Sequence, residues 1–216
     1  MGTITAETLI NSVAKTLQDE TNVKWLRAEL LEYLNDGQRE IVLAKPDAHV
    51  TNAPFQLVAG AKQVIPADGV MFMRMNCNLG VSGNTPGRAP RLIPIKVLDE
   101  QIPNWRAENP TGVVLHYTYD EKDPKRFYVY PPQPAVSPHQ VEIVYSASPA
   151  DVAAEANPIT LDDIWKTALV KYMEYRAYSK DAEYAREDAA ADRSYQVFAA
   201  LIGFKDKAED EEKATR

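Results

Sequence analysis

The residues of this sequence that could do chemistry are its histidines, its cysteine and its paired carboxylates. The three histidines, His49, His116 and His139, lie far apart and show none of the close spacings of zinc ligands. Cys77 is the single cysteine, so a disulfide within the chain and a cysteine-based zinc site are both excluded. These residue types and spacings predict no metal, no cofactor and no catalytic residue.

Glycine patterns that bind phosphate or position a nucleophile are also missing from the sequence. It contains no Walker-type G-x-x-x-x-G-K-[ST] loop, no dinucleotide-binding glycine pattern and no G-x-S-x-G elbow. Gly80, Gly83 and Gly87 lie in a stretch rich in Asn, Ser and Pro, which indicates a loop. We therefore expect neither nucleotide chemistry nor acyl transfer.

Paired carboxylates leave one enzymatic alternative open, a cell-wall hydrolase. Such an enzyme needs two carboxyl groups across a sugar groove, one of them with a raised pKa in an apolar pocket. Asp162 and Asp163 are adjacent, so on a helix they would point in different directions, and they suit a helix start better. Glu29 and Glu32 are three apart but lack the context of a groove. The preferred prediction is a protein that is not an enzyme.

The bulk composition favours a soluble protein made in a reducing cytoplasm. The chain has 216 residues and a formal net charge of −7, with no basic block suited to gripping phosphate backbones. An acidic surface lets DNA pass without sticking, because like charges repel. No apolar run is long enough for a bilayer, and the N-terminus lacks the plan of a secretion signal.

The distribution of proline predicts the fold class. The 15 prolines gather in the middle of the chain, whereas both ends are poor in Pro and Gly. This pattern predicts an α+β protein in which residues 1–48 and 159–203 form an antiparallel helical bundle. Residues 49–158 are expected to form a β-rich insertion with a mobile loop at 78–90. Residues 204–216 are expected to form an extended, flexible C-terminal tail, because Phe204 is their only large apolar residue.

Residues 24–48 carry the clearest helical pattern. Leu26, Leu30 and Leu34 recur at the helical period, and Pro46 ends the pattern. Inside this helix lies the polar run Asn35-Asp36-Gly37-Gln38-Arg39, although a Gly in mid-helix costs about 1 kcal/mol relative to Ala. We expect Gly37 either to let another backbone approach or to mark a bend, with the polar run beside it hydrogen-bonded to a neighbouring chain. The alternative is a solvated face with a tolerated glycine.

The middle of the chain reads as short strands. Residues 55–58 and 63–65 are expected to pair as a hairpin, and residues 113–119, 126–130 and 140–145 as an antiparallel meander. Toward the C-terminus, two further helices are expected. The first carries a wide apolar face around Trp165 and Tyr172, and the second begins at Asp181 and stops at Gly203.

Five segments, in order, carry a family resemblance. They read W-x-x-x-E-L-L-x-x-L-N-D-G-Q-R-E-I-V then K-P-D-A, L-x-A-G-x-x-Q-x-x-P, L-D-x-x-x-P-x-W, F-Y-V-Y-P-P and Y-S-K-D. They begin at Trp25, Leu57, Leu98, Phe127 and Tyr178. With these segments the chain resembles the head-to-tail adaptor (connector) proteins of tailed, and in particular short-tailed, bacteriophages. The resemblance runs from about residue 6 to residue 203.

The resemblance implies a structural protein of the virion neck, assembled in the host cytoplasm. Its implied partners are the portal protein, further copies of itself in a ring, expected to be a dodecamer, and a downstream tail or nozzle protein. Genomic DNA would pass through the central channel without sequence-specific binding, and no membrane is involved. A virion-associated cell-wall hydrolase and a tail- or fibre-attachment protein remain the alternatives.

The resemblance and the residue pattern together suggest three groups of site residues. The C-terminal group, expected to bind the portal, is Phe204, Lys205, Asp206, Lys207 and Arg216. The group expected to form subunit–subunit contacts is Trp25, Asn35, Gln38, Arg39, Trp165 and Tyr172. Arg88 and Arg91, which border the loop at 78–90, are the expected contacts to DNA in the channel.

Overall fold

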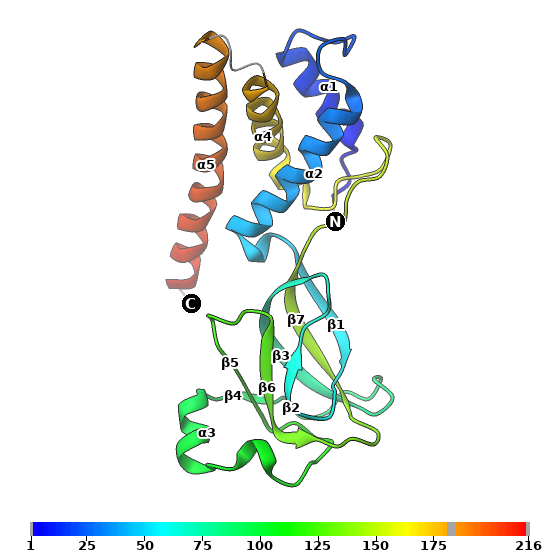
Figure 1. The fold of residues 1–216 in the computed structure, drawn as a ribbon, viewed down its shortest axis with the longest axis vertical. Helices are drawn as coiled ribbons and strands as arrows, with labels where there is room; N and C mark the ends of the chain where they lie inside the picture. The colour runs from blue at the N-terminus through cyan, green and yellow to red at the C-terminus, as the bar shows by residue number, and fades with distance from the viewer. Residues whose placement is uncertain (1, 181–184, 215–216) are drawn as a thin grey trace. The chain divides into compact units, whose positions relative to one another are not determined.

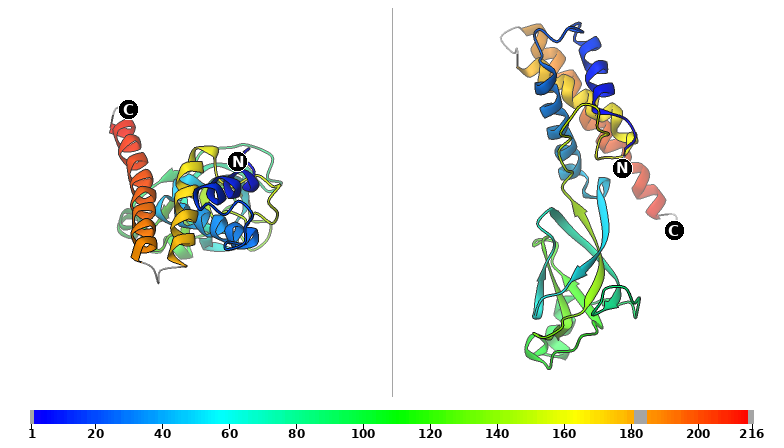
Figure 2. Two further views of the ribbon diagram at one scale, coloured as in Figure 1. Left: turned by 90° about the horizontal axis from the view of Figure 1, so that it is seen from above. Right: turned by 90° about the vertical axis from the view of Figure 1, so that its right-hand side faces the viewer.

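The computed structural model describes residues 2–180 and 185–214, which fold into two compact units (Figures 1 and 2). One unit is helical and holds both ends of the chain, up to Ala48 and from Pro149. The other unit is His49–Ser148 and contains the strands.

In the helical unit, α4 lies between α5 on one side and the pair α1 and α2 on the other (Figures 1 and 2). The elements are α1 Ala6–Thr16, α2 Arg27–Ala44, η1 Pro46–Ala48, η3 Asp163–Trp165, α4 Lys166–Ser179 and α5 Ala185–Ala214. Each of the helices α1, α2 and α4 buries apolar residues at helical spacing, such as Ile10, Leu34 and Leu169. The short helix η3 is capped by Asp162, whose carboxylate accepts a hydrogen bond from the Ile164 N–H (3.0 Å).

The other unit packs two sheets face to face (Figure 1). Its strands are β1 Val50–Gln56, β2 Gly60–Val64, β3 Gly69–Gly80, β4 Arg91–Leu92, β5 His116–Tyr119, β6 Arg126–Gln133 and β7 Gln140–Ala147. The strand orders are β1-β7-β3 and β2-β6-β5-β4, with antiparallel pairs except for the parallel pair β4–β5. Phe72 of one sheet stacks on Phe127 of the other, with 4.4 Å between ring centroids. This pair lies in the apolar core between the sheets.

A smaller apolar cluster packs against the four-stranded sheet and is built around the fully buried Trp105. It includes residues of α3 Ile95–Gln101 and η2 Trp105–Ala107, and Tyr128 of β6 packs against it. The Trp105 indole N–H donates to the Asp99 carboxylate (2.8 Å), so the buried ring of η2 has a partner for its polar atom and is joined to α3.

The expected fold, an antiparallel helical bundle from both chain ends with an insertion and an extended tail, is wrong. Over the described residues the chain is an α+β protein with five α-helices and two sheets of three and four strands, and it is β-rich. The strands bury a core of their own, and α3 belongs to their unit. The prolines of the middle therefore punctuate a complete two-sheet fold.

The C-terminal segment is also corrected, because α5 continues through Gly203 to Ala214. Gly203 lies inside this helix, and a Cβ atom added to it would meet none of the described atoms within 4 Å. The sequence beyond it places Lys205 and Glu209, and Lys207 and Glu211, four positions apart, a spacing that supports a helix. The predicted helix start at Asp181 lies outside the described residues.

Two of the expected strand pairings are wrong as well. Residues 55–58 and 63–65 do not form a hairpin, because β1 and β2 belong to different sheets. Strands β5 and β6 do pair, but β7 lies between β1 and β3, so no three-strand meander forms. The alternation of apolar and polar residues along a strand shows which residues face a core, but it does not identify the neighbouring strand. These pairings therefore depend on the packing of the two sheets.

Candidate functional site

The polar run of α2 forms hydrogen bonds to the backbone of the segment that follows Pro149, between Val152 and Leu161. The Asn35 Oδ1 atom accepts a hydrogen bond from the Val152 N–H (2.8 Å), and the Asn35 amide donates to the Val152 carbonyl (3.3 Å). The Gln38 Oε1 atom accepts from the N–H groups of Thr160 (2.8 Å) and Leu161 (3.2 Å). Asn35 and Gln38 are both buried. Because the intervening segment has no helix or strand ladder of its own, these amides satisfy its backbone groups.

At Gly37 it is side chains of α4, rather than another backbone, that approach α2, and the buried Asn35 and Gln38 do not form a solvated face. A Cβ atom at Gly37 would lie 2.9 Å from Tyr172 Cδ1 and 3.3 Å from Leu169 Cδ2. Both side chains belong to α4, so the missing side chain lets α2 and α4 approach closely. The run is therefore a packing surface inside the helical unit.

A partly exposed charged network borders this packing surface. The Arg176 guanidinium donates to the Asp36 carboxylate (2.9 Å) and lies over the Tyr33 ring, 4.9 Å from its centroid. Arg39 is paired with both Asp36 (3.2 Å) and Asp151. The network links α2, α4 and the segment that follows Pro149. It combines an interhelical ion pair with a cation–π contact.

Most residues expected in subunit–subunit contacts have internal partners in the single chain. Trp25 is 5% exposed and its indole N–H donates to the Ala177 carbonyl (3.0 Å), while Trp165 and Tyr172 are also buried. Asn35 and Gln38 are buried as described above, and Arg39 alone among the six is exposed. Their role in a ring stays a prediction, and Arg39 is its most accessible member.

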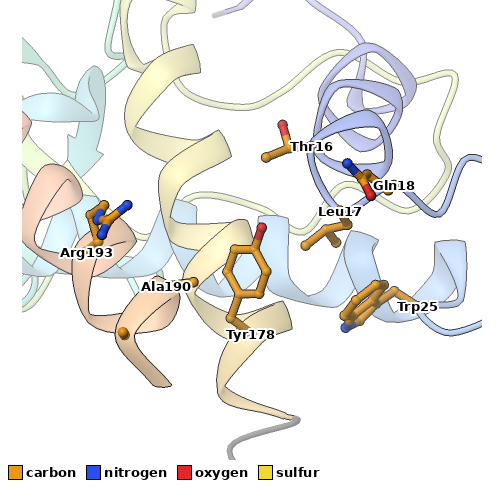
Figure 3. Close-up of a pocket in the computed structure, with 8 residues that line it drawn as sticks. Thr16, Leu17, Gln18, Trp25, Tyr178, Ala190 and Arg193 are labelled. Atoms are coloured by element: carbon orange, nitrogen blue, oxygen red, sulfur yellow. The ribbon is translucent and has the colours of Figure 1, made fainter. Parts of the chain in front are cut away.

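A cavity of about 590 Å³ opens at the end of α4, between α1 and α5 (Figure 3). Leu17 and Trp25 line one side, Ala190 and Arg193 line the other, and Tyr178 lies between them. Thr16, Gln18 and Ala189 complete the described lining. No carboxylate or histidine is among the lining residues that the structure describes.

Asp19 organises the loop that carries Trp25 to this cavity. Its carboxylate accepts hydrogen bonds from the backbone N–H groups of Trp25 (3.0 Å), Val23 (3.0 Å) and Lys24 (2.8 Å). These bonds favour the charged form and lower the pKa of Asp19, the bond from Trp25 contributing most. The role of Asp19 is structural.

Two of the carboxylates considered for a hydrolase, Glu29 and Asp163, make structural contacts. Glu29 accepts from the Tyr33 hydroxyl (2.6 Å) and from the Lys180 ammonium (2.8 Å). Asp163 accepts from the Thr3 hydroxyl (2.5 Å) and from the backbone N–H of Ile4 (3.0 Å), tying down the N-terminal segment. In the part of the chain that the structure describes, no cluster of three or more His, Cys, Asp or Glu could hold a metal ion.

The structure brings Arg88 and Arg91 to one place, beside His116, which sequence reasoning assigned to no site. Both arginines are exposed, and both act on the His116 imidazole electrostatically. His116 was missed because its nearness to Arg88 depends on how the preceding loop folds back. The β-branched and aromatic strand pattern of residues 113–119 was the only sequence signal at this position.

Of the residues expected to bind the portal, Phe204, Lys205, Asp206 and Lys207 fall on α5, and Arg216 lies outside the described residues. Across the described helices, none combines the length and apolar composition that a bilayer crossing requires. The sites found here consist of amides that bind backbone, ion pairs between helices and surface arginines.

Comparison with known families supplies the class of the protein. The chain matches the model of the SU10 adaptor protein family over residues 4–215 and belongs to that family, which is a family of phage head-to-tail adaptors. Membership indicates a structural component of the virion that associates with portal and tail proteins. No curated protein matches the chain.

Proposed function

We propose that this protein forms the ring that joins the capsid portal to the tail of a phage virion, with a central channel for DNA. The observation that carries the proposal is the family match over residues 4–215. A ring of identical subunits, here a dodecamer, uses two different faces of each subunit and closes by rotation. The helical unit is the proposed ring-forming part, and Arg39 is its proposed exposed contact.

The C-terminal part of α5 is the proposed portal contact. Helix α5 has 30 residues and packs principally on α4, which has 14. At 1.5 Å per residue these helices are about 45 Å and 21 Å long, so α5 extends well past the helix that supports it. An amphipathic or charged helix end of this kind suits docking into a groove of a partner. Phe204, Lys205, Asp206 and Lys207 fall on this overhang.

Arg88 and Arg91, which belong to the unit that contains the strands, are the proposed contacts to DNA. The chain carries net charge −7, so its long-range field does not favour tight DNA binding. Local guanidinium contacts to phosphates position a nucleic acid without reading its bases. This suits a genome that passes through a channel.

Mass measurement by light scattering tests the proposal. The full chain is measured alone, mixed with its cognate portal protein, and mixed with portal after truncation behind Gly203. We expect a ring of defined stoichiometry on the portal with the full chain and no association with the truncated chain. Circular dichroism of the truncated protein checks that its remaining helices and strands are intact. Unimpaired portal binding by the truncated chain would reject the role of the C-terminal helix, and no association of the full chain would reject the adaptor role.

A further inference from the structure

Three side chains line up across the four-stranded sheet. Arg91 of β4 is the register partner of His116 of β5, and His116 is the register partner of Tyr130 of β6. Directly paired residues of neighbouring strands project from the same face of a sheet, so these three form a row on one face. The His116 imidazole lies nearly parallel to the Tyr130 ring, with centroids 6.1 Å apart and an interplanar angle of 9°. The stacked phenol therefore holds the imidazole beside Arg91.

Arg88 reaches the same place because Asn78 pins the loop that precedes β4. The Asn78 amide donates to the carbonyls of Arg88 (2.7 Å) and Val114 (2.9 Å), and its Oδ1 accepts from the Val114 N–H (2.8 Å). Asn78 is 3% exposed, so these bonds are buried. One side chain thus joins the end of β3, the loop and the approach to β5, and it sets the position of Arg88 relative to His116.

These two arginines lack the acidic partners that most other arginines have. Ion pairs to carboxylates are formed by Arg27, Arg39, Arg106, Arg126 and Arg176. Arg88 and Arg91 have no carboxylate partner among the residues that the structure describes. The chain has 31 acidic and 24 basic residues, so carboxylates are not in short supply. The Glu108 carboxylate is hydrogen-bonded to Tyr130 of the same row, so the two exposed guanidinium groups beside the imidazole are left to bind an anion.

We propose that Arg88, Arg91 and His116 form a binding site for phosphodiester groups of a nucleic-acid backbone. The proposal rests on the proposed adaptor function, which supplies DNA as the polyanion, and it adds His116 and a chemical mode of binding. A guanidinium presents several donors in a plane and binds phosphate oxygens in pairs. Such contacts are independent of base sequence. The site therefore recognises the backbone, with only one or two phosphates engaged.

Binding at this site is coupled to a proton on His116. Burial lowers the pKa of His116, and the fields of Arg88 and Arg91 lower it further. Its Nδ1 atom is buried without a hydrogen-bond partner, which also disfavours the imidazolium. The groups that face it are the two arginines and Tyr130, whose own pKa is raised by a hydrogen bond to Glu108. A bound phosphate would offset the arginine fields and raise the pKa of His116, so by linkage the anion binds more tightly at low pH.

Fluorescence anisotropy of the full chain with a labelled DNA duplex tests the site. We compare the wild type, Arg88→Ala/Arg91→Ala and the control Arg74→Ala, which removes an exposed arginine elsewhere in the same unit. Removing two phosphate contacts should weaken binding and reduce the slope of log K against log salt by roughly 1–2. The control should keep the wild-type slope. An unchanged slope in the double variant would overturn the site.

The proton coupling has its own readout. Wild-type affinity should rise as the pH falls below about 6.5, the ordinary pKa of a histidine, whereas His116→Gln should lose this rise and keep its affinity at higher pH. A pH response that persists in His116→Gln would reject the role of the imidazole.

Competition with inorganic phosphate and with polyglutamate distinguishes ligands, and polyglutamate competing as well as DNA would overturn a nucleic-acid site. Light scattering with portal is independent, so loss of DNA binding and loss of ring assembly can be told apart.

Discussion

Asn35 and Val152, 117 positions apart in the chain, are joined by a reciprocal pair of hydrogen bonds that uses both polar ends of the Asn35 amide. The side chain thereby substitutes for a neighbouring strand and satisfies both backbone groups of Val152. This pair and the Gln38 bonds to Thr160 and Leu161 hold the irregular segment that leads into η3 and α4. The polar run of α2 thus organises the helical unit.

Replacing Asn35 by Ala should destabilise the protein. The change leaves the Val152 N–H and carbonyl without partners in a buried place, a cost of about 1–3 kcal/mol in the free energy of unfolding. Urea denaturation followed by circular dichroism measures it. The matched control is Gln196→Ala, an exposed amide on α5, which should change stability by less than about 0.5 kcal/mol. Equal effects for the two variants would refute the role given to Asn35.

Gly37→Ala should destabilise the protein even though Ala is the better helix former. The new Cβ would meet Tyr172 Cδ1 at 2.9 Å, and the buried ring cannot move aside freely. Overpacking of this kind costs about 1–3 kcal/mol, more than the gain of about 1 kcal/mol from helix propensity. Gly203→Ala is the matched control, because this glycine is also helical and has open space around it. In thermal unfolding, the melting temperature should be lower than that of the wild type for Gly37→Ala, and unchanged or higher for Gly203→Ala.

Arg39→Ala should separate folding from assembly. Arg39 pairs with Asp36 and Asp151 at the surface, and exposed ion pairs contribute about 0–1 kcal/mol, so the fold should change little. If Arg39 contacts a neighbouring subunit, its removal should weaken ring formation on the portal, measured by light scattering. Arg126→Ala, which breaks an exposed ion pair to Asp123, is the control and should assemble normally. Normal assembly of Arg39→Ala would remove this residue from the proposed interface.

Acid should loosen the loop around Asp19. The folded-state pKa of Asp19 is lowered, so its hydrogen bonds stabilise the fold at a pH above its ordinary value of 3.8. That contribution is lost as the pH falls below 3.8 and passes through the lowered pKa, because the unfolded chain takes up the proton first. Asp19→Asn removes this titration, so its stability should depend less on pH between about 5 and 3. Melting temperatures of both proteins across this range measure the difference, and parallel curves would count against the assignment.

Local features of this protein were readable from its residues. The 3.6-residue period and Pro46 predicted a helix that the structure places at Arg27–Ala44, and β-branched and aromatic residues located β5, β6 and β7 within a few positions. The ordered motifs identified the adaptor family, which the family match over residues 4–215 confirms. These properties depend on neighbours in sequence, so the residues themselves determine them.

Tertiary structure decided what depends on distant partners. Alternation cannot say which strand pairs with which, so the assignment of β7 to the sheet of β1 and β3 came only from packing. The continuation of α5 through Gly203 overrode a local stop signal, and His116 met Arg88 only because buried Asn78 folds the loop back. The burial of the Asn35 side chain likewise depends on its hydrogen bonds to Val152, 117 positions away. Such contacts form when buried polar groups must find partners, and sequence spacing carries no record of which partner that is.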